Sequence, residues 1–293
     1  MLSMMLMVAL AMQAQLKVAP KMQKGLEKVF TTVTTTNIPG QKAVTITTDT
    51  KYAVSDATAG GYVVDVTVTD VAADVTPDNI AGQLLQANAE VLKDITVRVG
   101  TNKDGKVERI VNYAELQPKI DKVCGQIVEN MFKKVPDLSQ RLSRDVLKQQ
   151  LAGAITEETL INSMRAATSG LVFNGKTLMT GAQEEFVNDQ GLKMKRMYFV
   201  TGKNVVAKSS MNMSKDELKA LVIAQVEKMM PDQASMIKDN IDQLMDSGML
   251  KMEMDETANY ELQDDGWIKS ITVDTTSKTM GQNVTSHAVV TAK

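Results

Sequence analysis

The methionines are the residues whose type and spacing most favour a binding chemistry. The chain has 293 residues, of which 21 are Met. Thioethers gather in the patterns Met211-x-Met213 and Met249-x-x-Met252-x-Met254, and residues i and i+2 of a strand share one face. Such a face could bind Cu(I), a soft metal. The other interpretation is packing, because thioether chains fill irregular gaps and line apolar pockets. We expect packing or pocket lining, with copper binding as the alternative.

Side chains for acid–base and nucleophilic chemistry are few. His287 is the only His and Cys124 the only Cys, which excludes an intramolecular disulfide and a Cys-based zinc site. Cys124 lies on an apolar stripe, where a buried thiol is inert. The neighbours Glu184 and Glu185 point in different directions, unlike the paired carboxylates of a glycosidase. No P-loop, G-x-S-x-G or H-E-x-x-H motif occurs. We therefore predict a protein that is not an enzyme and has no metal or cofactor.

Composition and charge exclude several other classes. Hydrophobic residues make up 43% of the chain and charged residues 23%, as in ordinary globular proteins. The 33 basic and 35 acidic residues give a net charge of -2. A strongly basic surface and basic patches with interleaved aromatics are absent, so we expect no nucleic-acid partner. No segment reaches ~18 continuous apolar residues, so we expect no transmembrane segment.

The first residues predict export. Residues 1–15 read MLSMMLMVALAMQAQ, without charge from Leu2 to Met12. This run is shorter than the ~20 residues that cross a bilayer as a helix, and its length is typical of the apolar region of a secretory signal peptide. Cleavage fits after Ala11 or after Ala14. We predict a signal peptide over 1–14 and a soluble mature protein in the periplasm, cell envelope or outside the cell. The alternative is a buried N-terminal helix.

Hydrophobic periodicity predicts the fold. Apolar and polar residues alternate over 29–71, which indicates an antiparallel meander. Apolar residues recur every three or four positions over 116–168, which indicates helices. Strands are expected again over 171–213 and 250–290. Between them Ser214-Lys215-Asp216-Glu217 is a capping box that opens a second helical insertion. The predicted class is α+β, a large curved antiparallel, half-barrel-like sheet of roughly ten strands, with helical insertions packed on one face.

The same pattern predicts one domain. We expect a single curved-sheet domain over 15–293, which divides in an alternative interpretation into two β-rich halves, 15–113 and 169–293, joined by a helical insertion over 115–168. A wide curved sheet cannot fill its own concavity with side chains. The helices must therefore plug the concavity or leave a cavity there.

Two segments carry a resemblance to known proteins. They are KGLEKVF, from Lys24 to Phe30, and DDGWIKSITVDTT, from Asp264 to Thr276. With the apolar N-terminus and the long meander, they resemble an uncharacterised secreted β-rich family of Bacteroidetes-type bacteria. That family is similar in outline to the LolA/LolB-like half-barrel lipoprotein carriers. The resemblance implies a half-barrel that holds acyl chains between a curved sheet and helices.

The function expected from the sequence is binding. We predict an exported envelope protein that is a non-enzymatic binding module for a lipid or other apolar molecule. One alternative is a structural or protein-interaction protein without a small ligand, which meets an envelope protein partner through a sheet edge or its helices. The other is Met-rich copper binding. The candidate ligand-binding residues are Leu250, Met252, Met254, Tyr260 and Trp267 from the closing strands, and Leu221, Met229, Met236 and Met245 from the helices.

Overall fold

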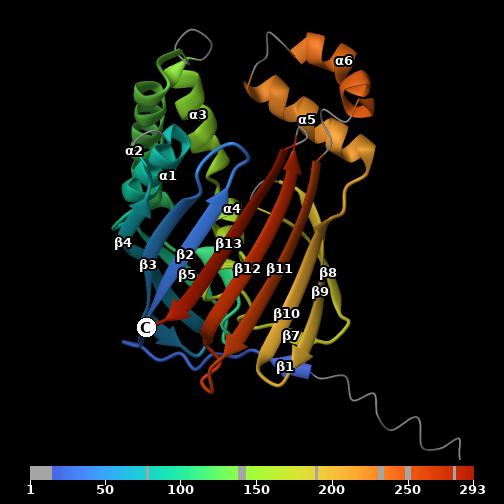
Figure 1. The fold of residues 1–293 in the computed structure, drawn as a ribbon. Helices are drawn as coiled ribbons and strands as arrows, with labels where there is room; N and C mark the ends of the chain where they lie inside the picture. Colours follow the sequence, from blue (N-terminus) through green and yellow to red (C-terminus); the bar gives the residue numbers. More distant parts are fainter. Residues whose placement is uncertain are drawn as a thin grey trace, which may run out of the picture.

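A computed structural model describes residues 15–76, 79–137, 143–188, 191–229, 234–247, 252–279 and 282–293. Eleven strands form one curved antiparallel sheet in the order β6-β5-β4-β3-β2-β13-β12-β11-β10-β9-β8 (Figure 1). The predicted α+β class with a large antiparallel sheet is confirmed. The strands of this sheet are β2 (Glu27–Asn37), β3 (Val44–Thr58), β4 (Gly61–Asp74), β5 (Thr96–Thr101), β6 (Val107–Ile110), β8 (Gln183–Val187), β9 (Lys193–Thr201), β10 (Asn204–Met211), β11 (Met252–Leu262), β12 (Ile268–Thr279) and β13 (Gln282–Ala292).

The first and last long strands meet in the middle of the sheet. β2 pairs with β13, and Val33 lies opposite Val289. The halves 15–113 and 169–293 therefore supply the two sides of one continuous sheet, and their hydrogen bonds join them along this central pair. A second sheet has two short strands, β1 (Gln15–Lys17) and β7 (Thr177–Met179).

The helices stand mainly at one end of the sheet. α1 (Ile80–Val91), α2 (Tyr113–Lys134) and α3 (Arg144–Ala154) form one group there, and α5 (Lys215–Met229) and α6 (Ala234–Asp246) form another (Figure 1). α4 (Glu157–Met164) packs through its apolar residues against the core of the sheet. The predicted capping box is confirmed: the Ser214 N–H donates to Glu217 Oε2 at 2.9 Å, and the Glu217 N–H donates to Ser214 Oγ at 3.2 Å. Among the described residues, no helix is long and apolar enough to cross a membrane.

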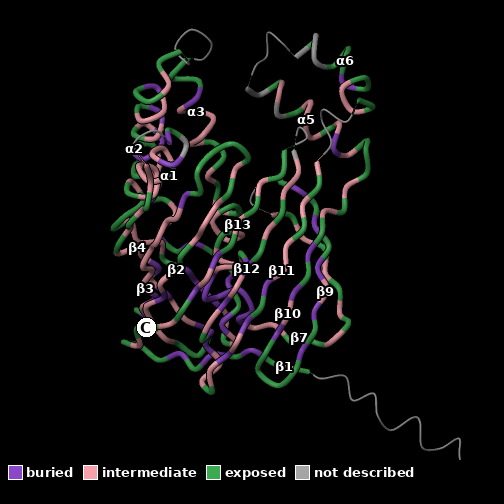
Figure 2. Tube along the Cα trace, in the orientation of Figure 1, coloured by how far each residue is buried: buried purple, intermediate pink, exposed green. Residues whose placement is uncertain are grey.

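Alternation divides the side chains between two faces of the sheet. On β2, Phe30 points to the inner, concave face and is 1% exposed, whereas Val33 points outward and is 36% exposed. Buried positions gather behind the lower half of the sheet, away from the two helical groups (Figure 2). There Tyr52, Val64 and Ile271 belong to one large apolar core. The core is therefore the inner face of the half-barrel, as the alternation predicts.

The predicted strand that begins at Leu171 is wrong. Leu171, Val172 and Phe173 lie in consecutive turns, each at most 2% exposed. Their side chains insert against the inner face, where the Phe173 ring centroid lies 4.4 Å from that of Tyr260. An apolar run of this length fits either a buried strand or a buried turn, and burial against the sheet decides it. We call residues 165–176 the wedge, because they fill the concavity beside α4.

The opposite end of the half-barrel is closed by the N-terminal segment. Residues 15–26, here called the strap, run across the strand ends that are remote from the helices (Figure 1). The Lys21 N–H donates to Asp265 O at 2.8 Å, and the Trp267 indole N–H donates to Lys21 O at 3.1 Å. Val18 of the strap is 1% exposed and belongs to the core. The strap thus closes one end of the concavity, and the wedge occupies part of its interior.

Candidate functional site

A row of polar side chains crosses the inner face above the apolar core. Cross-strand pairing aligns these residues one strand at a time, from the edge strand β8 to β2. The row, here called the polar row, consists of Glu184, Arg196, Ser209, Glu256, Thr275, Ser286 and Thr36. Inward positions on a curved sheet are normally apolar. A continuous polar line at this height therefore marks the upper boundary of the core.

Arg196 is the centre of this row and is only 5% exposed. Its Nε donates to Ser209 Oγ at 2.9 Å, and its Nη2 donates to Glu256 Oε1 at 3.2 Å. Its Nη1 lies 3.6 Å from Glu184 Oε1. The guanidinium also stacks over Phe186, 4.2 Å from the ring centroid, a favourable cation–π geometry. The guanidinium is thus held on several sides and has a fixed position.

Glu184 joins the row to the wedge. Lys176 Nζ donates to Glu184 Oε2 at 3.0 Å, and the Tyr198 hydroxyl also donates to Glu184. Burial by itself raises the pKa of Glu184, but the charge of Lys176, these hydrogen bonds and Arg196 lower it below the ordinary value. Burial raises the pKa of the Tyr198 phenol, so it stays protonated as a donor. The two cations and the two row carboxylates balance, and the cluster is neutral.

A second line of side chains lies next to the polar row on the side of the helices. Phe186 pairs with Met194, and Met194 pairs with Met211 across β9 and β10. Ser210 pairs with Asp255 of β11, so Met211 lies beside Met254. We call Phe186, Met194, Met211 and Met254 the Met row. It gives the inner face a flexible, polarizable apolar wall directly above the charges.

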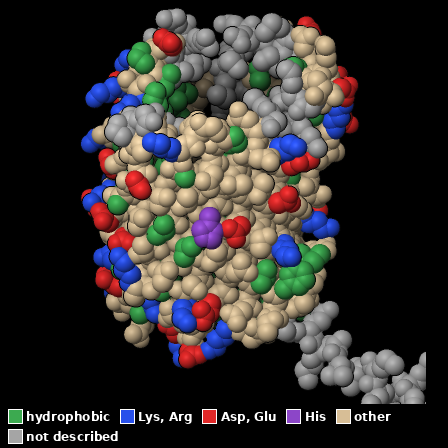
Figure 3. Space-filling model, viewed as in Figure 1, with side chains coloured by type: hydrophobic (Ala, Val, Ile, Leu, Met, Phe, Trp, Pro, Cys, Tyr) green, Lys and Arg blue, Asp and Glu red, His purple; other side chains and the backbone are tan. Residues whose placement is uncertain are grey.

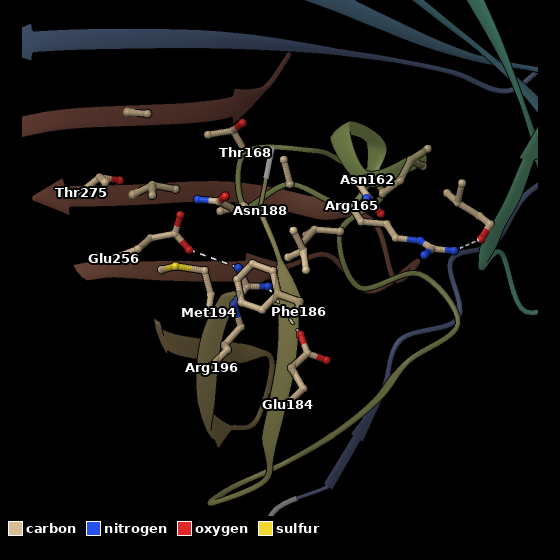
Figure 4. Close-up of a pocket in the computed structure, with 18 of the residues that line it drawn as sticks. Asn162, Arg165, Thr168, Glu184, Phe186, Asn188, Met194, Arg196, Glu256 and Thr275 are labelled. Atoms are coloured by element: carbon tan, nitrogen blue, oxygen red, sulfur yellow. Dashed lines mark hydrogen bonds and ion pairs between the residues drawn. The ribbon is translucent and has the colours of Figure 1, made fainter. Parts of the chain in front are cut away.

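A cleft of about 710 Å³ lies between these rows and the wedge. Figure 4 shows Arg196, Glu184 and Glu256 on the sheet side, with Arg165 and Asn162 across from them. Its apolar lining includes Leu171, Val172, Phe186, Met194, Met254, Val273 and Ala288, and its polar lining includes Thr34, Thr275 and Ser286. The volume lies within the ~300–1,000 Å³ of small-molecule sites. The cleft is thus large enough for a ligand with both apolar and polar parts.

The wedge supplies the other wall. Glu157 Oε1 accepts a hydrogen bond from the Ile110 N–H at 2.9 Å, which fixes the start of α4 to β6. At the end of α4, Arg165 Nη2 donates to Val107 O. Asn174 lines the cleft and is 5% exposed, yet its Nδ2 has no hydrogen-bond partner in the part of the chain that the structure describes. A buried amide without a partner is costly, and its place on the wall of a cleft is where a ligand oxygen could accept from it.

The residues expected from the sequence are distributed over three places. Met254 lines the cleft, and Met252 lies half-buried on the same face of β11. Tyr260 and Trp267 fill the core at 2% and 1% exposure. Leu221 and Met245 lie half-buried on α5 and α6; the side chains of Met229 and Met236 and the whole of Leu250 lie outside the described residues. The structure thus brings Met254 into the cleft and Tyr260 beneath it.

The charged residues of the cleft were missed by the sequence reasoning, although a signal exists. In the β9 sequence Met194, Arg196, Tyr198 and Val200 occupy the inward positions. An arginine among inward apolar residues must find a buried anion. The same alternation places Glu256 between Met254 and Ala258 on β11. Charged residues at inward positions of neighbouring strands are therefore the pattern that predicts this site.

The remaining chemically competent residues lie elsewhere. His287 is on the outer face, and its Nδ1 lies 2.7 Å from Asp274 Oδ1. Figure 3 shows the His (purple) near the middle of this face, where most of the charged side chains lie toward the edges. Cys124 is buried in α2 at 0% exposure. Among the described residues, no group of three or more His, Cys, Asp or Glu side chains is placed to hold a metal ion. These residues do not contribute to the cleft.

No protein-family model and no curated protein sequence matches the chain, so no family is assigned. Among solved structures, the chain is distantly similar to one described as "Lipid-protein interactions in lipovitellin", with a TM-score of 0.37 and 8% identity over 93% of this chain. It spans 25% of the length of that lipovitellin chain. A porin-like protein from Bacteroides uniformis is similar with a TM-score of 0.19 and 9% identity, over 91% of this chain and 95% of that one.

Proposed function

We propose that the protein is a non-enzymatic binding module of the cell envelope that holds a lipid or another amphipathic molecule in the cleft. The observation that carries this proposal is the cleft of about 710 Å³ between the sheet and the wedge, with an apolar wall beside a charged one. The Met row suits flexible chains, because thioether side chains adapt to irregular apolar partners. Location in the envelope rests on the apolar residues 1–14.

The energetics require contributions from both walls. Burial of an alkyl chain contributes ~0.8 kcal/mol per methylene, so ten methylenes along the Met row give ~8 kcal/mol. Association costs ~4–15 kcal/mol, because the ligand loses translational and rotational freedom. Apolar burial alone is therefore comparable with the cost. Polar contacts at the other wall decide whether binding is tight, which favours an amphipathic ligand over a hydrocarbon.

The proposal is tested by native mass spectrometry of the protein purified without detergent, before and after organic extraction. We expect a bound mass in the lipid range that extraction removes. Thr275 is half-buried in the polar row and lines the cleft, whereas its neighbour Thr276 points outward and is exposed. Thr275→Trp should fill the cleft and remove the bound mass, and Thr276→Trp should retain it. A wild-type protein that is free of any ligand and takes up no alkyl ligand would contradict the proposal.

A second candidate, Cu(I) binding, is favoured by the Met row. Met194, Met211 and Met254 lie on one face of three neighbouring strands, and thioethers prefer Cu(I). Titration with Cu(I) against a chromophoric chelator tests this candidate. Stoichiometric binding that is lost in Met211→Leu would support it, and no competition with the chelator would exclude it.

A further inference from the structure

The hydrogen-bond donors at the wedge side of the cleft exceed the acceptors available to them. The Arg165 guanidinium has five N–H donors, and its one hydrogen bond to a described residue goes to Val107 O. Both N–H groups of the Asn174 amide are unused. Lys106 lines the same wall and makes no ion pair with a described residue. These unused N–H groups on the cleft wall could donate hydrogen bonds to acceptor atoms of a ligand.

These donors are close to one another. Gly175 follows Asn174 with a φ of +74°, and a Cβ built there would lie 2.6 Å from Lys106 Cβ. Arg165 bonds to Val107, the residue after Lys106. Burial lowers the pKa of Lys176, and Glu184 partly offsets this effect by raising it. The positive charges of Arg196 and Arg165 lower the pKa of Lys176 further. The turn at Gly175 thus brings the donors of the wedge and of the β5–β6 turn to one wall.

The charges leave this wall positive. Glu184 and Glu256 are engaged by Arg196 and Lys176. Two more carboxylates line the cleft. Glu185 accepts from Asn212 Nδ2 at 3.1 Å, and Glu158 lies exposed in the first turn of α4, seven residues or about 10 Å along the helix from Arg165. Arg165 and Lys106 therefore form no ion pair with any carboxylate among the described residues.

We propose that Arg165, Asn174 and Lys106 form the subsite for an oxyanion, a carboxylate or a phosphate, at the polar end of the ligand. This inference rests on the proposed function and names the chemistry of its ligand. A guanidinium with several free N–H groups binds a planar or tetrahedral oxyanion through paired hydrogen bonds. The Asn174 amide adds a neutral donor, and the alkyl part of the ligand then lies along the Met row.

A substitution of Asn174 distinguishes a ligand-binding role of this residue from a structural role. Its Nδ2 makes no hydrogen bond to a described residue, so Asn174→Leu removes an unsatisfied buried donor and roughly keeps the shape of the side chain. We expect the melting temperature of the unliganded variant to be unchanged or higher, because the cost of burying the amide disappears. Affinity for an oxyanion ligand should fall. A residue with only a structural role would show the opposite, a loss of stability without a change in ligand preference.

The test compares dodecanoate, dodecyl phosphate and dodecanol, below micelle-forming concentrations, by isothermal titration calorimetry on the full chain. Charge-assisted hydrogen bonds contribute ~1.5–3 kcal/mol, so an anionic ligand should bind at least about ten-fold tighter than dodecanol. The tighter of the two anions identifies the oxyanion as carboxylate or phosphate. Arg165→Gln and Asn174→Leu should each reduce this preference and leave dodecanol binding within about two-fold.

Two residues on the outer face of the sheet provide matched control variants. Arg98→Gln and Asn259→Leu change an arginine and an asparagine of the outer face, and they should leave the preference intact. Equal affinity for all three ligands would overturn the oxyanion subsite while the binding module stands. No binding of any of the three would overturn the proposed function as well.

Discussion

Arg196 offers the sharpest test of how the cleft is built. Arg196→Met keeps an unbranched apolar stem but ends short of the guanidinium, so the stacking over Phe186, whose ring centroid lies 4.2 Å from the guanidinium, is lost. It removes the hydrogen bonds to Ser209 at 2.9 Å and to Glu256 at 3.2 Å, and the ion pair with Glu184 at 3.6 Å. The substitution therefore removes every interaction of one buried cation and leaves an apolar stem in its place.

The magnitude follows from what remains buried. The Glu256 side chain is 16% exposed and loses its cation, whereas Glu184 keeps Lys176 and Tyr198. Breaking a buried pair by removing one partner costs ~3–5 kcal/mol. Because one of the two carboxylates remains paired, we expect a loss near the lower limit, about 3 kcal/mol. Arg196→Met/Glu256→Leu removes both charges and should recover most of this loss.

Urea denaturation followed by Trp267 fluorescence measures these differences, because Trp267 is 1% exposed in the core. The control is Arg98→Met, since Arg98 and Asp65 form an ion pair at 3.6 Å with side chains 49% and 22% exposed. An exposed pair of this kind contributes ~0–1 kcal/mol. The reasoning is refuted if Arg196→Met is no more costly than Arg98→Met, or if the double variant is as unstable as the single one.

Three further predictions concern the wedge, the acid response and the thiol. Phe173→Ala should destabilise the protein by ~3–5 kcal/mol in urea denaturation, because the ring is 1% exposed; Phe199→Ala, at 40% exposure, should cost far less, and equal costs would contradict the wedge as part of the core. The pKa of Glu184 is lowered in the folded protein, so its stabilisation is present above its unfolded pKa of ~4.3 and is lost as the pH falls through the folded pKa. Glu184→Gln should therefore lower stability at pH 7 and flatten the acid limb of a stability–pH profile, and an unchanged acid limb would contradict the assignment. Burial, and next the charge of Asp121, raise the pKa of Cys124, so a thiol reagent should modify it only in denaturant, and rapid labelling of the folded protein would contradict its burial.

The sequence predicts the outline of the fold because local rules determine much of it. Asp104-Gly105 and Asp265-Gly266 form turns, with φ of +84° at Gly105 and +82° at Gly266. At both positions a positive φ suits glycine. Alternation along β3 and β4 predicts which residues face the core, and the apolar spacing of residues 116–134 predicts α2. Each of these signals lies within a short stretch of chain.

The wedge could not be predicted in this way. Leu171-Val172-Phe173 has the composition of a short buried strand. Its conformation depends on Phe30 and Tyr52 of distant strands, since a Cβ at Gly170 would lie 3.2 Å from the Phe30 ring and 3.4 Å from the Tyr52 ring. The Gly170 N–H also donates to the Tyr52 hydroxyl at 3.2 Å. Tertiary contacts across more than one hundred residues thus select turns over a strand.

The two walls of the cleft differ in the hydrogen bonds that they can still make, and under the proposed function we expect this difference to orient the ligand. On the sheet side, Arg196 already contacts Ser209, Glu256 and Glu184. A ligand group that bound Arg196 in their place would leave a buried carboxylate unpaired. On the wedge side, Arg165 and Asn174 have donors to spare. A polar end of a ligand gains hydrogen bonds at the wedge without breaking any at the sheet. The satisfied wall is thus a neutral boundary, and under the proposed function we expect the unsatisfied wall to select the ligand.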